Sequence, residues 1–362
     1  MRDIVDGLIG WRGRGERFAL ATVVRTWSSA PRPPGAAMAV SAAGEVLGSI
    51  SGGCVEGETY EMAQRAIESG RPTLARFGVS DEDAFATGLT CGGIIEVFVE
   101  PVGDQQLAVL DQTLDAIKAG RPTVVATVTA GPAVGQHLTM DESGLTSSTV
   151  GPEAVDILLP RMATMLDRTA TEMVHMGQLP GPLTSTSVFL QSFAPPPRMI
   201  VFGAIDFAAA VADIGKFLGY HVTVCDARPV FATPARFPGV DRLVVDWPHR
   251  YLSSEKVDED TVLCVLTHDP KFDIPLLKVA LETPARYVGV MGSRRAHADR
   301  LEALRSEGVP EWQLERLRSP IGLDLGARTP EETAVSIAAE IIAAARGATG
   351  APLREREGAI HR

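Results

Sequence analysis

The sequence has few cysteines, an excess of acidic over basic residues and no long apolar run. Its four cysteines, Cys54, Cys91, Cys225 and Cys264, form no Cys-x-x-Cys pair, which argues against a zinc knuckle or a thioredoxin-like redox pair. No run reaches the roughly 18 apolar residues expected of a membrane-spanning helix. The formal net charge of −11 argues against nucleic acid or an anionic membrane as the main partner.

Residues 1–15 lack the continuous apolar core of a secretory signal, so we expect no export. A cytoplasmic protein with reduced thiols is the simplest interpretation. A chain of 362 residues with 45% apolar and 22% charged residues is typical of two globular domains.

The pattern of elements changes at a proline-rich stretch. We expect an α/β domain over 1–193, a stiff linker at 194–198, a second domain over 199–347 and a tail over 348–362. The second domain alternates apolar strands with helices, which predicts a Rossmann-like, doubly wound parallel sheet. Its expected strands are 199–202, 220–225, 242–246, 261–266 and 287–291, and its expected helices are 207–218, 296–306 and 331–346.

The first domain contains what reads as two copies of one unit, over 16–103 and 121–193. The strand expected at 123–129 resembles the strand at 18–24 in its sequence pattern, and the helix expected after Gly151 corresponds to the helix expected at 58–68. Chance similarity of short strands is the alternative. The second copy has Pro152 and Ala154 where the first has Gly53 and Cys54, so only the first would carry chemistry.

The segment 48–57 combines glycines and serines with one cysteine and one glutamate between an apolar strand and a helix. A glycine-rich turn that enters a helix lets backbone N–H groups approach an anion, and the helix dipole stabilises a thiolate at that position. We interpret this segment as a site for an anionic ligand beside a soft sulfur atom. The alternative is a tight turn around a small buried cysteine. The candidate residues are Ser51, Gly52, Gly53, Cys54 and Glu56.

The first turn of the second domain departs from the dinucleotide-binding pattern. Of G-x-G-x-x-G only Gly203 is present; Ile205 and Asp206 bring bulk and negative charge to the place where a pyrophosphate would bind. Asp226 ends the second strand in the position of a ribose-binding acid. Because Ile205 and Asp206 disfavour a pyrophosphate at this turn, we do not expect bound NAD(P).

Three further loops follow strands of the second domain and should line one crevice, because the carboxyl ends of parallel strands meet at one edge of a sheet. His268 and Asp269 could move a proton or bind a ligand, or form an Asp-Pro turn with a solvated histidine. The loop 319–326 should line the same crevice. The third loop leads into a helix and offers backbone donors, a hydroxyl and two guanidinium groups, which predict a phosphate site. The alternative is a capped helix with surface arginines. The residues of this loop are Gly292, Ser293, Arg294 and Arg295.

Three segments together resemble the xanthine dehydrogenase accessory family, XdhC/CoxI. They are the Cys54 loop, the stretch 289–295, and the stretch 319–326 that leads into the Thr-Pro-Glu-Glu run at 329–332. The resemblance covers about 15–345. It implies an N-terminal domain with the cysteine motif and a Rossmann-like C-terminal domain. The implied role is to bind molybdenum cofactor, keep it sulfurated and assist its insertion into an enzyme, as a chaperone rather than a catalyst.

The resemblance also implies which residues and partners take part. Cys54 is the first candidate to contact molybdenum and Cys91 the second, with a molybdenum hydroxylase of the xanthine or CO dehydrogenase type as client. A cysteine desulfurase and a second copy of the chain are further expected partners. Two other functions stay open: an NAD(P)-linked oxidoreductase, and nucleotidyl transfer on the molybdopterin with metal-binding carboxylates from Asp206, Asp226 and Asp269.

Overall fold

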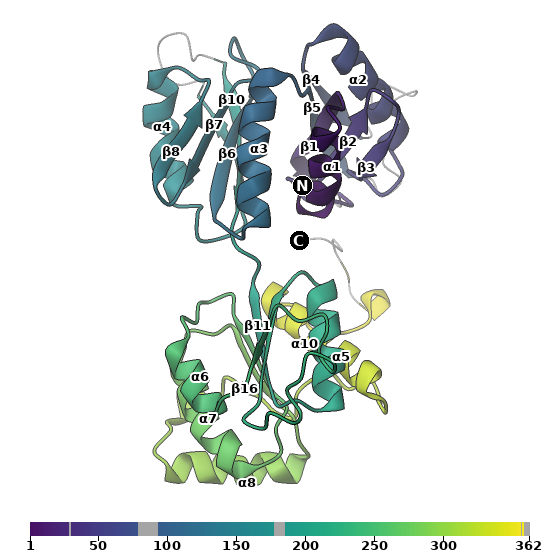
Figure 1. Cartoon of the computed structure of the whole chain (residues 1–362). Helices are drawn as coiled ribbons and strands as arrows, with labels where there is room; N and C mark the ends of the chain where they lie inside the picture. The colour runs from purple at the N-terminus through teal and green to yellow at the C-terminus, as the bar shows by residue number, and fades with distance from the viewer. Residues whose placement is uncertain (29, 79–92, 177–184, 356, 358–362) are drawn as a thin grey trace. The chain divides into compact units, whose positions relative to one another are not determined.

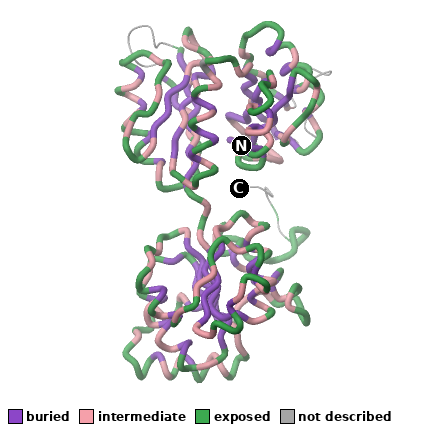
Figure 2. The backbone as a smooth tube through the Cα atoms, in the orientation of Figure 1, coloured by how far each residue is buried: buried purple, intermediate pink, exposed green. Residues whose placement is uncertain are grey.

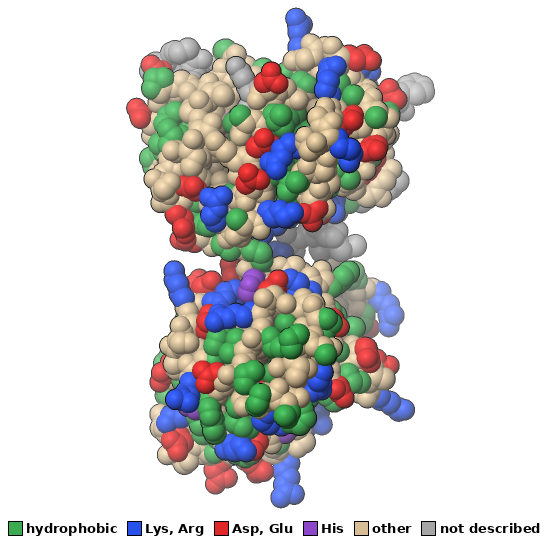
Figure 3. All heavy atoms as spheres, viewed as in Figure 1, with side chains coloured by type: hydrophobic (Ala, Val, Ile, Leu, Met, Phe, Trp, Pro, Cys, Tyr) green, Lys and Arg blue, Asp and Glu red, His purple; other side chains and the backbone are tan. Residues whose placement is uncertain are grey.

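The computed structural model describes residues 1–28, 30–78, 93–176, 185–355 and 357. The chain divides into two compact units, Met1–Pro195 and Pro196–Arg356 (Figure 1). Within the described residues, no helix has both the length and the apolar character needed to cross a membrane. On the face seen in Figure 3, acidic and basic side chains are interspersed on each unit instead of gathering into one basic patch.

The first half of unit 1 is a five-stranded antiparallel sheet, which we call sheet A, with the strand order β3-β2-β1-β5-β4. Helix α2 covers one face of this sheet and forms a core with it, and helix α1 packs against the other. The elements are η1 (Arg2–Ile4), α1 (Val5–Gly13), β1 (Phe18–Trp27), β2 (Ala37–Ser41), β3 (Val46–Gly48), α2 (Glu56–Ser69), β4 (Thr73–Phe77) and β5 (Ile94–Pro101).

The second half of unit 1 is sheet B, whose strand order β8-β7-β6-β10-β9 matches that of sheet A position by position. Helix α4 covers one face of sheet B, as α2 covers sheet A. Two sheets with one connectivity fit the interpretation of a duplicated unit. The elements are α3 (Asp104–Lys118), β6 (Thr123–Ala130), β7 (His137–Asp141), β8 (Gly144–Ser148), α4 (Pro152–Ala163), β9 (Thr171–His175) and β10 (Ser187–Phe193).

The two sheets of unit 1 meet through the faces that do not carry α2 and α4. Val24 and Phe98 of sheet A pack against Phe189 of sheet B. An ion pair also joins the sheets: Nε2 of His137 lies 2.9 Å from a carboxylate oxygen of Glu100. Strand alternation therefore gives each sheet one face toward its own helix and one toward the other sheet.

Unit 2 is a parallel six-stranded sheet with the order β13-β12-β11-β14-β15-β16. Helices α5 and α10 pack on one face, while α6, α7, α8 and α9 pack on the other. Figure 2 shows the buried strands at the centre of this unit, between more exposed segments. The sheet comprises β11 (Arg198–Phe202), β12 (His221–Cys225), β13 (Arg242–Val244), β14 (Val262–Val265), β15 (Tyr287–Val290) and β16 (Leu317–Arg318). The helices are α5 (Asp206–Phe217), α6 (Pro248–Ser254), α7 (Pro270–Glu282), α8 (Arg294–Ser306), α9 (Glu311–Leu314), α10 (Pro330–Arg346) and η2 (Leu353–Glu355).

This architecture confirms the predicted fold class, because the parallel sheet carries helices on both faces. The closing helix begins at Pro330, one residue before the expected start, and is capped by its sequence: the Thr329 hydroxyl accepts from the Glu332 N–H, and the Glu332 carboxylate accepts from the Thr329 N–H. Cys225 and Cys264 are fully buried in β12 and β14, as core residues should be.

Candidate functional site

The loop 49–55 joins β3 to α2 and carries the cysteine singled out in the sequence. Gly52 and Gly53 have φ angles of +78° and +119°, in the region that favours glycine. A Cβ atom placed on either residue would meet no atom of the described residues within 4 Å. The backbone thus requires glycine at both positions, and among the described residues nothing blocks the approach of a ligand to their α-carbons.

The carboxylate of Glu56 is the acceptor around which this loop folds. It accepts hydrogen bonds from the N–H groups of Ser51 and Gly52, both at 2.9 Å, and of Gly53 at 2.8 Å. The N–H groups of Ile50 and Val55 add longer bonds of 3.3 and 3.2 Å. Backbone donors that converge on one anion form a nest. Here the anion is a side chain of the protein itself.

Two hydroxyl groups complete the shell of donors around Glu56. The Ser49 hydroxyl donates at 2.6 Å, and the Ser51 hydroxyl donates to the other carboxylate oxygen. Burial alone would raise the pKa of Glu56, but the bonds from Ser49, Ser51 and Gly53 outweigh it and lower this pKa to about 2. Glu56 is therefore ionised at neutral pH and occupies the donors that the sequence suggested for a ligand.

Cys54 is partly exposed and packs along the edge of the core that α2 forms with sheet A. It lies two residues before the helix, and its N–H donates to the Ser51 hydroxyl at 3.0 Å. The described part of the chain contains no group of three His, Cys, Asp or Glu residues that could hold a metal ion. Cys91, the second cysteine candidate, lies outside the described residues.

The first turn of unit 2 uses its polar groups internally. Gly203 has φ +102°, and a Cβ there would come within 3.0 Å of the Thr267 methyl group. The next N–H, of Ala204, donates to Asp226 at 2.7 Å. Arg228 donates to the same carboxylate through Nε at 2.9 Å and Nη2 at 2.8 Å. Both oxygens of Asp226 are thus occupied where a ribose would need them.

Asp206 opens α5 on the surface and pairs with Arg236 at 2.9 Å. Asp269 caps α7 by accepting from the Lys271 N–H at 3.1 Å, and the hydrogen bonds from Lys271 lower the pKa of Asp269. His268 is exposed. The three carboxylates considered for nucleotidyl transfer form no metal cluster within the residues that the structure describes.

The segment 292–295, where a phosphate site is expected, leads from β15 into α8. The Ser293 hydroxyl caps α8 by accepting from the Ala296 N–H at 3.1 Å. Arg294 and Arg295 are exposed, and within the described residues their side chains form no hydrogen bond or ion pair. In the loop 319–326, the Ile321 N–H donates to the Val290 carbonyl at 3.0 Å, whereas residues 324–326 are exposed.

Arg300, which the sequence did not single out, is a buried guanidinium group beside the segments that follow β15 and β16. It donates to Asp273 at 3.0 Å, to the Met291 carbonyl at 3.2 Å and to the Ser319 hydroxyl at 3.3 Å. Both partners of the Arg300–Asp273 pair are buried. Burial raises the pKa of Asp273 even though Thr267 and Arg300 donate to it. Arg300 thus ties together the segments after β15 and β16. The sequence feature that could have indicated its burial is its position four residues before Leu304, on the buried face of α8.

The fold and the site define a two-unit α/β protein with a cysteine-bearing glycine loop in one unit and a Rossmann-type sheet in the other. A family model described as "XdhC Rossmann domain" matches residues 199–341, and one described as "XdhC and CoxI family" matches residues 11–78. The chain belongs to the XdhC/CoxI family, which confirms the resemblance read from its motifs.

Several known proteins are similar over nearly the full length. One is a Bacillus subtilis protein named as a probable xanthine dehydrogenase subunit, with 29% identity over 90% of this chain and 93% of the relative. Another is the molybdenum cofactor insertion chaperone PaoD of Escherichia coli, 26% identical over 94% of this chain and 86% of the relative. A crystal structure from Bacillus halodurans, described as a xanthine dehydrogenase, has 26% identity and a TM-score of 0.73, covering 95% of this chain and 96% of that one.

Proposed function

We propose that this chain is an accessory protein that binds molybdenum cofactor and assists its insertion into a molybdenum hydroxylase. The observation that carries the proposal is the Cys54 loop, which offers one partly exposed thiol beside two glycines that leave room for a ligand. The similarity to a molybdenum cofactor insertion chaperone over 94% of the chain supports it. A desulfurase partner and self-association remain predictions from the family resemblance.

The residues of the loop fit a metal that arrives inside an organic cofactor. Thiolates are soft ligands suited to such a metal, and Cys54 supplies one. Gly52 and Gly53 present no side chains, so a bulky ligand can approach Cys54 from their side. Glu56 fixes the backbone by accepting from Ser51 and its neighbours, so the thiol is positioned before the cofactor arrives. When bound, the cofactor supplies the molybdenum centre that the recipient enzyme uses.

The occupied nest changes the expected manner of binding. The N–H groups of Gly52 and Gly53 already donate to Glu56, so they are not available to an anionic pterin phosphate in this conformation. We therefore propose that Cys54 makes the main contact and that the phosphate is held by other groups. In unit 2, the Arg228 bonds to Asp226 argue against NAD(P) as a second cofactor.

Two cysteine variants test the proposal. Cys54→Ser keeps the size of the side chain but replaces a soft donor with a poor one, so it should lose bound molybdenum without a change in melting temperature. Cys225→Ser is the matched control: it places a hydroxyl in an apolar strand, which should cost about 1–3 kcal/mol of stability and leave binding per folded molecule unchanged. Metal analysis and thermal unfolding after reconstitution give both quantities. Full molybdenum retention in Cys54→Ser would refute the assignment.

A further inference from the structure

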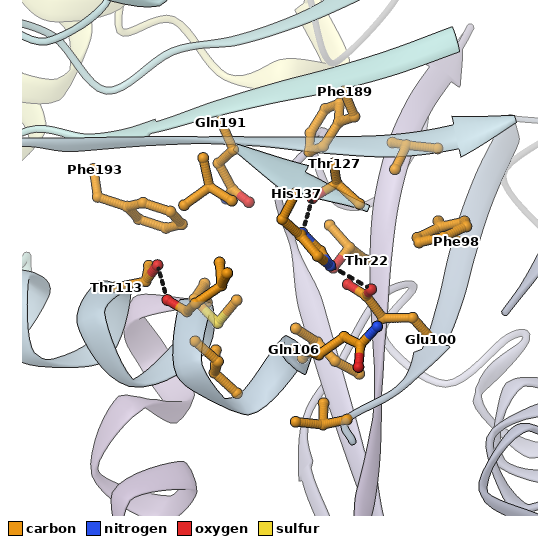
Figure 4. Close-up of a pocket in the computed structure, with 17 residues that line it drawn as sticks. Thr22, Phe98, Glu100, Gln106, Thr113, Thr127, His137, Phe189, Gln191 and Phe193 are labelled. Atoms are coloured by element: carbon orange, nitrogen blue, oxygen red, sulfur yellow. Dashed lines mark hydrogen bonds and ion pairs between the residues drawn. The ribbon is translucent and has the colours of Figure 1, made fainter. Parts of the chain in front are cut away.

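Helix α10 has an outer face that stays exposed in unit 2. Its inner face packs on the parallel sheet through Ala334, Ile337 and Ile341. Val335 and Ile342 lie outside that core and are 50% and 47% exposed. No other α-helix in the described part of the chain carries two large exposed apolar side chains. In unit 1, by contrast, the inner faces of the two sheets cover each other across a small cavity of about 50 Å³ (Figure 4).

The residues on this outer face have the spacing of a coiled-coil seam. Glu332, Val335, Ala339, Ile342 and Arg346, which we call the α10 seam, are separated by steps of three, four, three and four residues. This spacing places side chains on one face of a helix and is the pattern by which two helices pack along each other. A surface helix needs one apolar stripe for its own core, and α10 has that stripe on its inner face. The second stripe therefore indicates a helix as partner.

The charges at the two ends of α10 favour another copy of α10 as that helix. Glu331 and Glu332 lie in its first turn and Arg346 in its last. The N–H groups of Arg328 and Thr329 donate to the Glu332 carboxylate at 2.7 and 3.2 Å and lower its pKa, so this acid is ionised at neutral pH. Two parallel copies would bring like charges together, whereas two antiparallel copies bring the acidic end of each helix to the basic end of the other.

The α10 seam is also symmetric about Ala339. Glu332 and Arg346 each lie seven residues from Ala339, and Val335 and Ile342 lie four and three residues from it. A two-fold axis at Ala339 therefore places Glu332 against Arg346, and Val335 against Ile342, once on each side of the axis. The small side chain at the axis lets the two helices approach closely, and antiparallel helices also place opposite ends of their dipoles together.

We propose that the α10 seam is a homodimer interface, in which two copies of this chain pair their α10 helices antiparallel about a two-fold axis at Ala339. It supplies a surface for the self-association that the family resemblance predicts. The seam lies in unit 2 and the Cys54 loop in unit 1, so the proposal does not depend on what that loop binds. One helix pair is small beside the roughly 1,200–2,000 Å² of a standard interface, so the dimer should be weak, with a dissociation constant on the order of 10 µM.

Sedimentation velocity of the full-length protein measures this dimer, at concentrations from about tenfold below to about tenfold above that dissociation constant. Ile342→Asp places a charge on the seam and should raise the dissociation constant by about tenfold or more. Trp312→Asp is the matched control. Trp312 is 63% exposed on α9, which packs on the opposite face of the sheet, so its replacement should leave the dissociation constant unchanged. Melting temperatures show whether both variants are folded.

Disulfide cross-linking tests the orientation of the two helices. In a background in which Cys54 and Cys91 are replaced by serine, the remaining cysteines are buried in unit 2. Ala339→Cys should then form a linked dimer on mild oxidation, because the axis brings the two copies of this position together. Val335→Cys is the matched control, since the antiparallel copies of position 335 lie about 12 Å apart along the helix axis, beyond the roughly 7 Å that a disulfide spans.

A concentration-dependent dimer that Ile342→Asp weakens and Trp312→Asp leaves intact supports the proposal, as does a linked dimer from Ala339→Cys but not from Val335→Cys. A wild-type protein that stays monomeric across the whole range overturns it. So does a dimer that Ile342→Asp fails to weaken, and so does equally fast linking of Val335→Cys, which would indicate parallel helices. If Ile342→Asp does not fold, cross-linking decides: no linked dimer from Ala339→Cys overturns the proposal.

Discussion

The Glu56→Gln substitution is the sharpest test of how the cysteine loop is held. In the wild-type protein both carboxylate oxygens accept bonds, including those from Ser51, Gly52 and Gly53. A glutamine of the same length keeps one acceptor oxygen but replaces the other with an NH₂ group, which faces N–H donors. The loop should therefore lose most of its anchoring while α2 itself remains folded.

The depressed pKa of Glu56 sets the size of the effect. A fall from 4.5 to about 2 corresponds to an upper bound of about 3.4 kcal/mol for the ionised form. The carboxylate is partly exposed, and solvent screening reduces this to about 1–2 kcal/mol. Local opening of the loop should then be about 5- to 30-fold more frequent in Glu56→Gln than in the wild type.

Hydrogen exchange measured by mass spectrometry on the peptide 48–57 reports this opening directly. Glu58→Gln is the matched control, because Glu58 is also an acid in the first turn of α2 but is exposed. It should leave exchange of the peptide nearly unchanged. Equal exchange in the wild type and Glu56→Gln would refute the idea that Glu56 holds the loop.

The same comparison predicts a pH dependence with a definite sign. Because folding lowers the pKa of Glu56, the stabilisation is complete above about pH 4.5 and disappears as the pH falls toward about 2. The difference in exchange between wild type and Glu56→Gln should therefore shrink to less than half by about pH 3. Comparing the two proteins at each pH cancels the intrinsic pH dependence of exchange. A difference that stays constant down to pH 3 would contradict the charge argument.

Two predictions concern unit 2. Arg300→Met leaves Asp273 buried without its cationic partner and should lower the free energy of unfolding by about 3–5 kcal/mol, whereas adding Asp273→Leu should restore much of it. Urea unfolding measures both variants, and a loss below about 1 kcal/mol in the single variant would contradict this prediction. Gly203→Ala should destabilise more than Gly219→Ala: both have positive φ, but only at Gly203 does the new Cβ crowd Thr267. Melting temperatures in the reverse order would show that the crowding is relieved.

Elements with strong local signals were predictable from the sequence. The β-branched runs of β1, β6 and β14 form strands because such side chains fit a pleated, buried surface. The capping box of Thr329 and Glu332 marks the start of α10 to within one residue of the expected 331. Helix α3 was not among the predicted elements, although Leu107, Leu110 and Leu114 recur at helical spacing.

The site was harder to predict because its contacts depend on tertiary structure. An acid near a helix start is a common sequence feature, and nothing local shows that Glu56 folds back into its own loop. Arg294 and Arg295 lie at the start of α8. The side chain that bonds to the segments after β15 and β16 is instead that of Arg300, which shares a face of α8 with Leu304. His137 and Glu100 lie on different sheets, so no sequence pattern brings them together.

The burial of two cysteines has a practical consequence for chemical labelling. Burial raises the pKa values of Cys225 and Cys264 to about 12, and thiols react with alkylating reagents as thiolates. In a Cys91→Ser background, an alkylating reagent at neutral pH should therefore modify Cys54 selectively. The rate of that modification would then report, in real time and without a chromophore in the protein, whether the thiol is covered by cargo or has released it.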